Sequence, residues 1–82
     1  MNFEIEIKSR ALKDLKGLSP DDRRRVGERI GRLAHDLEGD VKRLRNFTPS
    51  YRMRCGDYRV LFEVEGNRVV IYRVRHRRDA YR

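Results

Sequence analysis

The arginine-rich segment 51–62 constrains the fold of this chain more than any other part of the sequence. Two stretches of alternating side chains flank the dipeptide Gly56-Asp57, which is typical of a two-residue hairpin turn. A tight turn fixes the pairs across the predicted hairpin: Cys55 with Tyr58, Arg54 with Arg59, Met53 with Val60, and Arg52 with Leu61.

Strand alternation sorts these side chains onto two faces. The first face collects apolar and aromatic residues: Tyr51, Met53, Cys55, Tyr58, Val60 and Phe62. The second face collects Arg52, Arg54 and Arg59. Like charges directly opposite each other destabilise a hairpin, and sequences usually break such local rules at functional sites. We therefore interpret the arginine face as an anion-binding site.

The charge of the chain points to the same class of ligand. Its 82 residues are enough for one small domain, 1–82, with a net charge of +8. Residues 51–82 contain nine arginines and no lysine. The planar donor fork of arginine matches phosphate, so this bias favours a nucleic-acid partner. A basic surface that is only solvated would have the same composition.

Metal, cofactor and membrane chemistry are all disfavoured by the sequence. The single cysteine, Cys55, excludes an internal disulfide and fits a reducing compartment. His35 and His76 do not match the spacing of zinc ligands, and glycine patterns for phosphate or dinucleotide binding are absent. No stretch has the apolar length of a membrane span or the pattern of a signal peptide. We expect a cytoplasmic protein without a metal ion or cofactor.

The region before the hairpin is predicted to begin with a strand and two helices. Residues 2–8 alternate between apolar and charged side chains, as in a strand with one buried face. Ser9 is a suitable N-cap for a first helix that ends at Gly17. Ser19 and Pro20 are typical of the start of a second helix.

The second helix carries one apolar stripe, formed by Val26, Ile30, Leu33 and Leu37. Gly27 and Gly31 lie beside this stripe and are predicted to let the two helices pack closely as an antiparallel hairpin. The basic segment 41–50 that follows is expected to be irregular, with Leu44 and Phe47 in the core.

A second two-residue turn, Gly66-Asn67, leads into strand 68–75. It predicts the pairs Val64 with Val69, Phe62 with Ile71, and Leu61 with Tyr72. Strand 68–75 is apolar on both faces, which is typical of a central strand. Continued alternation places His76 on the face of Arg59.

The predicted fold is therefore α+β: an N-terminal strand, an antiparallel two-helix hairpin, and a three-stranded antiparallel meander. The expected strand order is 51–55, 58–65, 68–75, 2–8. The helices are expected to cover the face that carries Phe3, Met53 and Phe62.

The run Tyr51–Val60, the Gly66-Asn67 hairpin and the closing run His76–Tyr81 together resemble the RelE/ParE superfamily of toxin–antitoxin toxins. The resemblance covers essentially the whole chain, including the order of strand, two helices and three strands. RelE-like members are messenger-RNA interferases that enter the ribosomal A site and cut the message there. ParE-like members share the fold and instead poison DNA gyrase.

The resemblance to RelE implies metal-independent attack of the RNA 2′-hydroxyl on the adjacent phosphate, leaving a 2′,3′-cyclic phosphate and a 5′-hydroxyl. Such a reaction needs a base, cations for the developing charge and an acid for the leaving oxygen. The family's active-site residues fall on these positions: Arg52, Arg54, Arg59, Arg77 (or Arg75) and Tyr81.

Some family members have lysines where this chain has Arg52 and Arg54. This difference affects which residues can act as general base and general acid. Arginine rarely gives up its proton, so these two side chains can bind phosphate and stabilise charge but are poor bases. His76, whose side-chain type has a reference pKa of about 6.5, is the candidate base. Tyr81 is the candidate acid, or a platform on which a base stacks.

His76 and Tyr81 also have structural explanations, the first as a strand-end residue and the second as an apolar anchor. The remaining arginines expected to bind RNA phosphates are Arg45, Arg75 and Arg78.

The resemblance implies three partners, namely a cognate antitoxin, the ribosome and messenger RNA. Two alternatives remain, a ParE-like inhibitor of gyrase and a non-catalytic module that binds RNA or a protein. Binding to gyrase needs no acid–base pair, so the arginine face with a nearby histidine and tyrosine favours the ribonuclease.

Overall fold

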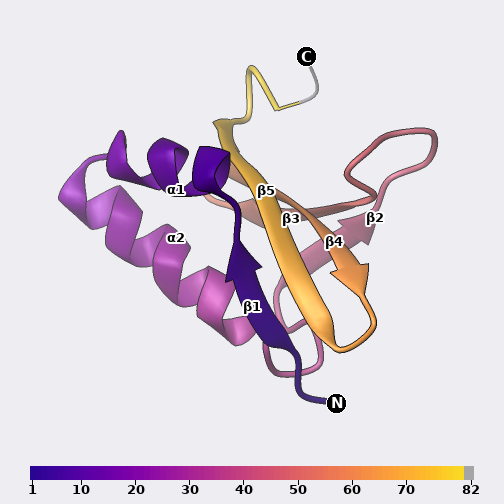
Figure 1. The fold of residues 1–82 in the computed structure, drawn as a ribbon. Coiled ribbons are helices and arrows are strands. Elements are labelled where there is room, and N and C mark those ends of the chain that lie inside the picture. The colour runs from indigo at the N-terminus through magenta and orange to yellow at the C-terminus, as the bar shows by residue number, and fades with distance from the viewer. Residues whose placement is uncertain (81–82) are drawn as a thin grey trace.

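The computed structural model describes residues 1–80 and contains two helices and a five-stranded mixed sheet. The elements are β1 (Glu4–Ile7), α1 (Ser9–Lys16), α2 (Pro20–Arg32), β2 (Asp40–Arg43), β3 (Tyr51–Cys55), β4 (Tyr58–Glu65) and β5 (Arg68–His76). Strand order is β1-β5-β4-β3-β2, with β1 parallel to β5 and every other pair antiparallel. Both helices lie on one side of the sheet (Figure 1). The α+β class and the predicted order of four strands are confirmed.

The helix ends follow the predicted capping signals in all but one case. Ser19 caps α2, because its Oγ accepts a hydrogen bond from the backbone N–H of Asp22 at 3.2 Å. Gly17 follows α1, and its N–H donates to carbonyls of the last turn. Ser9 is already helical, with Lys8 at the N-cap position and no side-chain cap. Within residues 1–80, no helix has the length and apolar character needed to cross a membrane.

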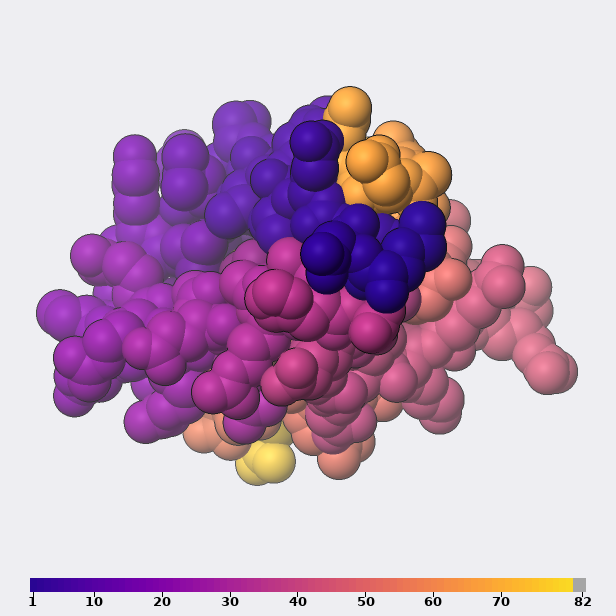
Figure 2. Space-filling view, turned by 90° about the horizontal axis from the view of Figure 1, so that it is seen from below, coloured from indigo at the N-terminus to yellow at the C-terminus, as the bar shows by residue number. Residues whose placement is uncertain are grey.

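α2 ends earlier than its apolar stripe predicts. Asp36 and Leu37 have positive φ values of 56° and 58°, so the chain has left the helix before the stripe is complete. The backbone of Phe3 donates to the carbonyl of Ala34 at 2.8 Å, and Asp36 donates to the carbonyl of Met1 at 3.0 Å. Figure 2 shows the indigo N-terminal segment lying against the magenta residues that follow α2. Pairing with the start of the chain therefore ends this helix.

The hydrophobic core lies between the helices and the sheet. Its buried members are Ala11, Leu15, Val26, Ile30, Leu33, Met53, Cys55, Val60, Phe62, Val69, Ile71 and Val74. The predicted apolar face of the hairpin is thus confirmed. Gly27 and Gly31 are exposed, and a Cβ atom on either would have no neighbour within 4 Å. The prediction that these glycines allow close helix packing is wrong.

Strand β2 was not expected, since segment 41–50 was predicted to be irregular. Its four residues pair antiparallel with β3, with Asp40 opposite Arg54 and Lys42 opposite Arg52. Val41 packs against the core, whereas Lys42 is exposed on the sheet edge, where a charge discourages pairing with another chain. The loop between β2 and β3 protrudes from the body (Figures 1 and 2).

A bulge in β5 changes which side chains share a face. Phe62 pairs with Ile71 as predicted, but Leu61 pairs with Arg73 and not with Tyr72. Tyr72 is therefore an extra residue in β5, and the alternation of every later residue is reversed. As a result Arg75 lies opposite Arg59, and His76 lies opposite Tyr58 on the helix side. The prediction that His76 shares the face of Arg59 is wrong.

Candidate functional site

Three arginines stand side by side on the sheet face that points away from the helices. Arg54 on β3 pairs directly with Arg59 on β4, which pairs directly with Arg75 on β5. We call these three residues the arginine row. Neighbouring strands are about 4.8 Å apart, so the row sets three permanent cations across roughly 10 Å of sheet.

The members of the row are held mainly by neutral or distant groups. The Nη1 atom of Arg59 donates to the carbonyls of Gly56 and Tyr58, both at 2.9 Å. Arg54 is exposed, and its Nε lies 3.8 Å from Oδ2 of Asp40. The side chain of Arg75 makes no hydrogen bond or ion pair with the described part of the chain, residues 1–80. The row therefore keeps most of its positive charge for a ligand.

Arg52 lies on the same face but is buried, with 7% of its surface exposed. Its Nη1 donates to the carbonyl of Asp40 at 3.3 Å and lies 3.6 Å from Oδ1 of the same residue. One aspartate thus holds both Arg52 and Arg54. Asp40 could not be identified from the sequence, because the strand that carries it has only four residues and is too short to show a clear period.

The loop after β2 covers Arg52. Leu44 and Phe47 are half-buried and line a shallow cavity of 310 Å³ together with Arg45 and Arg52. They are not members of the core cluster, so the prediction that they fill the core is wrong. Arg45 is exposed at the rim of this cavity, which places it next to the arginine face, as its predicted role in phosphate binding requires.

The residues after β5 turn back over the first hairpin. The backbone of Arg77 donates to the carbonyl of Asp57 at 2.7 Å, and its Nε lies 3.9 Å from Oδ1 of Asp57. Nδ1 of His76 accepts hydrogen bonds from the backbone N of Arg78 at 3.2 Å and from its Nε at 3.4 Å. Tyr81 lies outside the described residues. The structure thus brings Arg75, and not Arg77, into line with Arg59.

The ring of His76 packs edge-on against Tyr58, with 5.7 Å between ring centroids. Desolvation raises the pKa of the Tyr58 hydroxyl, and the nearby Asp22 carboxylate raises it further. Tyr58 therefore stays protonated over a wide pH range. Its hydroxyl and the His76 ring lie on the side of the sheet opposite the arginine row.

The position of the row depends on Asp14 of α1. This carboxylate accepts hydrogen bonds from Arg73 Nε at 2.8 Å, Arg73 Nη2 at 3.1 Å and Val74 N at 2.9 Å. Burial opposes ionisation of Asp14, but the bonds from Arg73 and Val74 outweigh it and lower the pKa, with the charge of Arg75 adding to the effect. Arg73 and Val74 directly follow the extra residue, Tyr72, in β5. The bonds from these two residues to Asp14 therefore stabilise the bulge.

The arrangement suits the binding of a phosphodiester. Arginine offers donors in a rigid fork and keeps its charge at any accessible pH. Fixed cations of this kind stabilise the charge that develops on phosphoryl oxygens in a transition state. The described residues 1–80 contain no group of three or more histidine, cysteine, aspartate or glutamate side chains arranged to hold a metal ion.

Comparison with known proteins shows the family to which this chain belongs. Residues 5–81 match the family described as the ParE toxin of the type II toxin–antitoxin system parDE. Toxin RelE3 of Methanocaldococcus jannaschii is 33% identical over 75 residues, covering 85% of each chain. RelE1 of the same organism is 34% identical over 88 residues, covering 100% of this chain and 98% of the relative.

A solved structure has the same fold. The Mycobacterium tuberculosis toxin–antitoxin complex RelBE2 contains a chain that superposes with a TM-score of 0.80 and 28% identity, covering 93% of this chain and 99% of that one. The family match spans nearly the whole sequence, and the arrangement of strands and helices is that of the solved relative. The chain therefore belongs to the RelE/ParE superfamily of type II toxin–antitoxin toxins.

Proposed function

We propose that this toxin is a ribosome-dependent endoribonuclease that cleaves messenger RNA in the A site. In the proposed reaction the RNA 2′-hydroxyl attacks the adjacent phosphorus and the bond to the next 5′-oxygen breaks. The products are a 2′,3′-cyclic phosphate and a 5′-hydroxyl. The observation that supports this most is the arginine row, since it concentrates permanent cations where a phosphate can reach them.

In this proposal the arginine row binds the scissile phosphate. Arg54, Arg59 and Arg75 contact the non-bridging oxygens and stabilise the negative charge that builds up in the phosphorane-like transition state. Arg52 is buried behind Arg54 and adds charge without needing to touch the RNA. Neighbouring phosphates are left for exposed arginines outside the row: Arg45, Arg77 and Arg78.

Proton transfer falls to two residues that follow the row in the sequence, His76 and Tyr81. His76 remains the proposed base, and it directly follows Arg75 at the end of β5. Because its Nδ1 accepts hydrogen bonds from Arg78, the imidazole must release Arg78 and turn past the strand end to reach a 2′-hydroxyl. Tyr81 is the proposed acid for the leaving 5′-oxygen, as a tyrosine stays protonated near neutral pH.

The test is single-turnover cleavage of a message on ribosomes programmed with a defined A-site codon. We expect one cut within that codon, a 2′,3′-cyclic phosphate at the new end, and no cut in the naked message. Arg24→Ala is the matched control for substitutions in the arginine row, because Arg24 is an exposed arginine on α2 whose ion pair within residues 1–80 is with Asp21. Wild-type protein that leaves the message intact on every codon tried would refute the proposal.

A second candidate is inhibition of DNA gyrase, because the matching family is described as the ParE toxin. In that case the arginine row would contact DNA or an acidic surface and no proton transfer would be needed. A supercoiling assay with purified gyrase separates the two candidates. Inhibition of gyrase by wild-type protein that does not cut messages would favour this second function.

We further propose that a cognate antitoxin neutralises the protein in the cytoplasm, where ribosomes are found. A related chain is part of a toxin–antitoxin complex, and the basic face of this chain suits an acidic segment that folds on binding. Co-expression with the product of the adjacent small reading frame is expected to restore growth and raise the melting temperature. Failure of any neighbouring product to bind would argue against such a system.

A further inference from the structure

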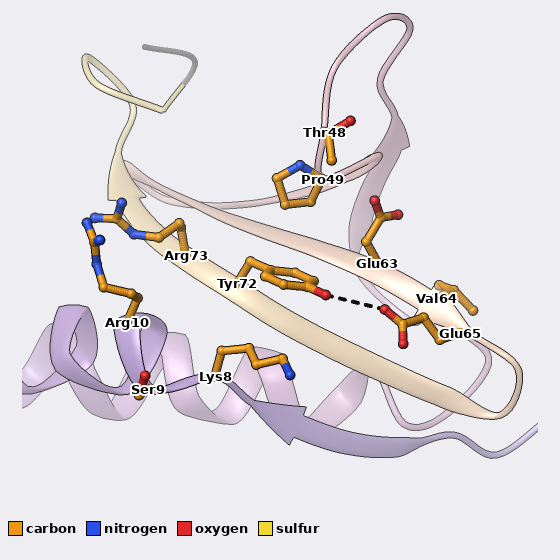
Figure 3. Close-up of a pocket in the computed structure, with 10 residues that line it drawn as sticks. All are labelled: Lys8, Ser9, Arg10, Thr48, Pro49, Glu63, Val64, Glu65, Tyr72 and Arg73. Carbon is orange, nitrogen blue, oxygen red and sulfur yellow. Dashed lines mark hydrogen bonds between the residues drawn. The ribbon is translucent and has the colours of Figure 1, made fainter.

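A second cavity, of 670 Å³, lies on the same side of the sheet as the arginine row. It opens between the loop that precedes β3 and the junction of β1 with α1 (Figure 3). The ring of Tyr72 lies along β5 between Lys8 on one side and Pro49 on the other (Figure 3). Nζ of Lys8 is 5.9 Å from the centre of that ring. The cavity thus has an aromatic floor at the bulge.

The two ends of this cavity carry opposite charges. Glu63 and Glu65 project from β4 at one end, and Arg10 lies at the other (Figure 3). Oε2 of Glu65 accepts a hydrogen bond from the Tyr72 hydroxyl at 3.3 Å, and Oε2 of Glu63 accepts one from Ser50 at 3.2 Å. Among residues 1–80, no donor bonds the second oxygen of either carboxylate. Each carboxylate can therefore accept further hydrogen bonds from a ligand.

An aromatic ring with carboxylate acceptors at its edge has the chemistry of a nucleobase site. Single-stranded RNA is read by stacking bases on aromatic rings and by hydrogen bonds to their edges. Guanine presents two neighbouring N–H donors, its ring N1–H and its amino group, which match the two oxygens of a carboxylate. Adenine, cytosine and uracil each place an acceptor beside the donor. An acidic peptide would be repelled by Glu63 and Glu65.

The cavity lies within reach of an RNA strand bound on the row. Glu63 and Arg59 share one face of β4 and are four residues apart, which corresponds to about 13 Å. Tyr72 and Arg75 are three residues apart on β5, or about 10 Å. Arg10 is exposed beside the cavity and can contact a further phosphate. A strand whose phosphate lies on the row can therefore place a neighbouring base over Tyr72.

We propose that this cavity binds a guanine base next to the cleaved phosphate and so determines which codons are cut. The proposal rests on the ribonuclease function, but binding of a free nucleotide tests it separately. In a calorimetric titration of the isolated protein, GMP is expected to bind at least about 5-fold more tightly than AMP, CMP or UMP. The double variant Glu63→Gln with Glu65→Gln should remove that preference.

The second arm uses cleavage on ribosomes with A-site codons that differ only in the position of guanine. Tyr72→Ala is expected to raise KM by about 5- to 150-fold, the range for losing one stacked base, with kcat little changed. Tyr72→Phe removes the hydrogen bond to Glu65 but keeps the ring, so it should retain most of the wild-type KM. Glu28→Gln, an exposed glutamate on α2, is the matched control for the charge changes.

The outcomes distinguish failure of the guanine site from failure of the ribonuclease function. Equal binding of all four nucleotides, or unchanged codon preference in the double glutamine variant, would overturn the guanine site even if cleavage is normal. Preferential GMP binding without any cleavage would support the cavity and refute the ribonuclease. Loss of antitoxin binding in Tyr72→Ala, with no nucleotide bound by wild type, would assign the cavity to the antitoxin and overturn the proposal.

Discussion

Replacing Asp14 by asparagine tests how the fold builds the arginine row. The side chains of Asp14 and Arg73 are 18% and 27% exposed, so solvent screens their interaction only in part. A hydrogen bond to a charged group contributes about 1.5–3 kcal/mol. The asparagine side chain would keep one acceptor oxygen but lose the charge and at least one of the three bonds. We expect a loss of about 2–4 kcal/mol in the free energy of unfolding.

The assay is thermal unfolding across a range of pH. A loss of this size lowers Tm by roughly 8–32 °C in a domain of this length. Because the pKa of Asp14 is lowered in the folded protein, its stabilisation is complete above the unfolded value near 3.9. That stabilisation disappears as the pH falls through the folded pKa. Wild type and Asp14→Asn should therefore differ most near pH 7, and the difference should shrink as the pH falls below about 3.9.

The matched control is Asp21→Asn. Asp21 pairs with Arg24 at 3.3 Å, but its side chain is 80% exposed, so the change is expected to be at most about 1 kcal/mol. A Tm for Asp14→Asn close to that of the control would refute the reasoning, as would a difference from wild type that does not shrink as the pH falls below about 3.9. A second readout is the pairing of β4 with β5, because loss of the bulge would place Val74 opposite Arg59.

Four further predictions follow from other parts of the structure. Arg59→Ala should slow cleavage on ribosomes by about 10²-fold or more while changing Tm by less than about 8 °C, because its bonds are to turn carbonyls; a large fall in Tm would make it structural. Binding to ribosomes should weaken with salt with a log–log slope of about −2 to −4 for three to five arginines, and a slope near zero would exclude phosphate binding. Gly27→Ala and Gly31→Ala should each stabilise the exposed face of α2 by about 0.5–1 kcal/mol in urea unfolding, whereas destabilisation would reveal a contact there. His76→Gln should lower single-turnover cleavage by about 10²-fold with ribosome binding intact, and near-normal cutting would assign proton transfer to another group.

The hairpins could be predicted from the sequence because their determinants are local. Gly56-Asp57 and Gly66-Asn67 set two-residue turns, and alternation then places Arg54 opposite Arg59 and Phe62 opposite Ile71. Each of these pairs depends on residues close together in the chain. The apolar face of the sheet follows from the same alternation.

The parts of the site that could not be predicted depend on distant contacts. The bulge is held by Asp14, which lies 59 positions before Arg73 in the chain. The burial of Arg52 depends on a loop that folds over it and on Asp40 in a four-residue strand, too short to show a clear period. Regular alternation without a bulge therefore predicts that His76 lies on the arginine face. It also predicts that Arg75 lies on the opposite face, so it gave no reason to include Arg75 in the row.

The extra residue in β5 also affects how relatives of different length are to be aligned. A chain that lacked Tyr72 would reach the position of Arg75 one residue sooner and would still set that arginine opposite Arg59, on a regular ladder. Such a chain would have no bulge for an aspartate to hold and no ring beneath the second cavity. An alignment of the two sequences by residue count from the Gly66-Asn67 turn would then match Arg75 with the wrong residue of the shorter chain. The three arginines of the two chains would nevertheless superpose in space. A one-residue insertion at this point therefore separates two features, the arginine row and the aromatic ring of Tyr72, that a gap-free alignment would treat as one.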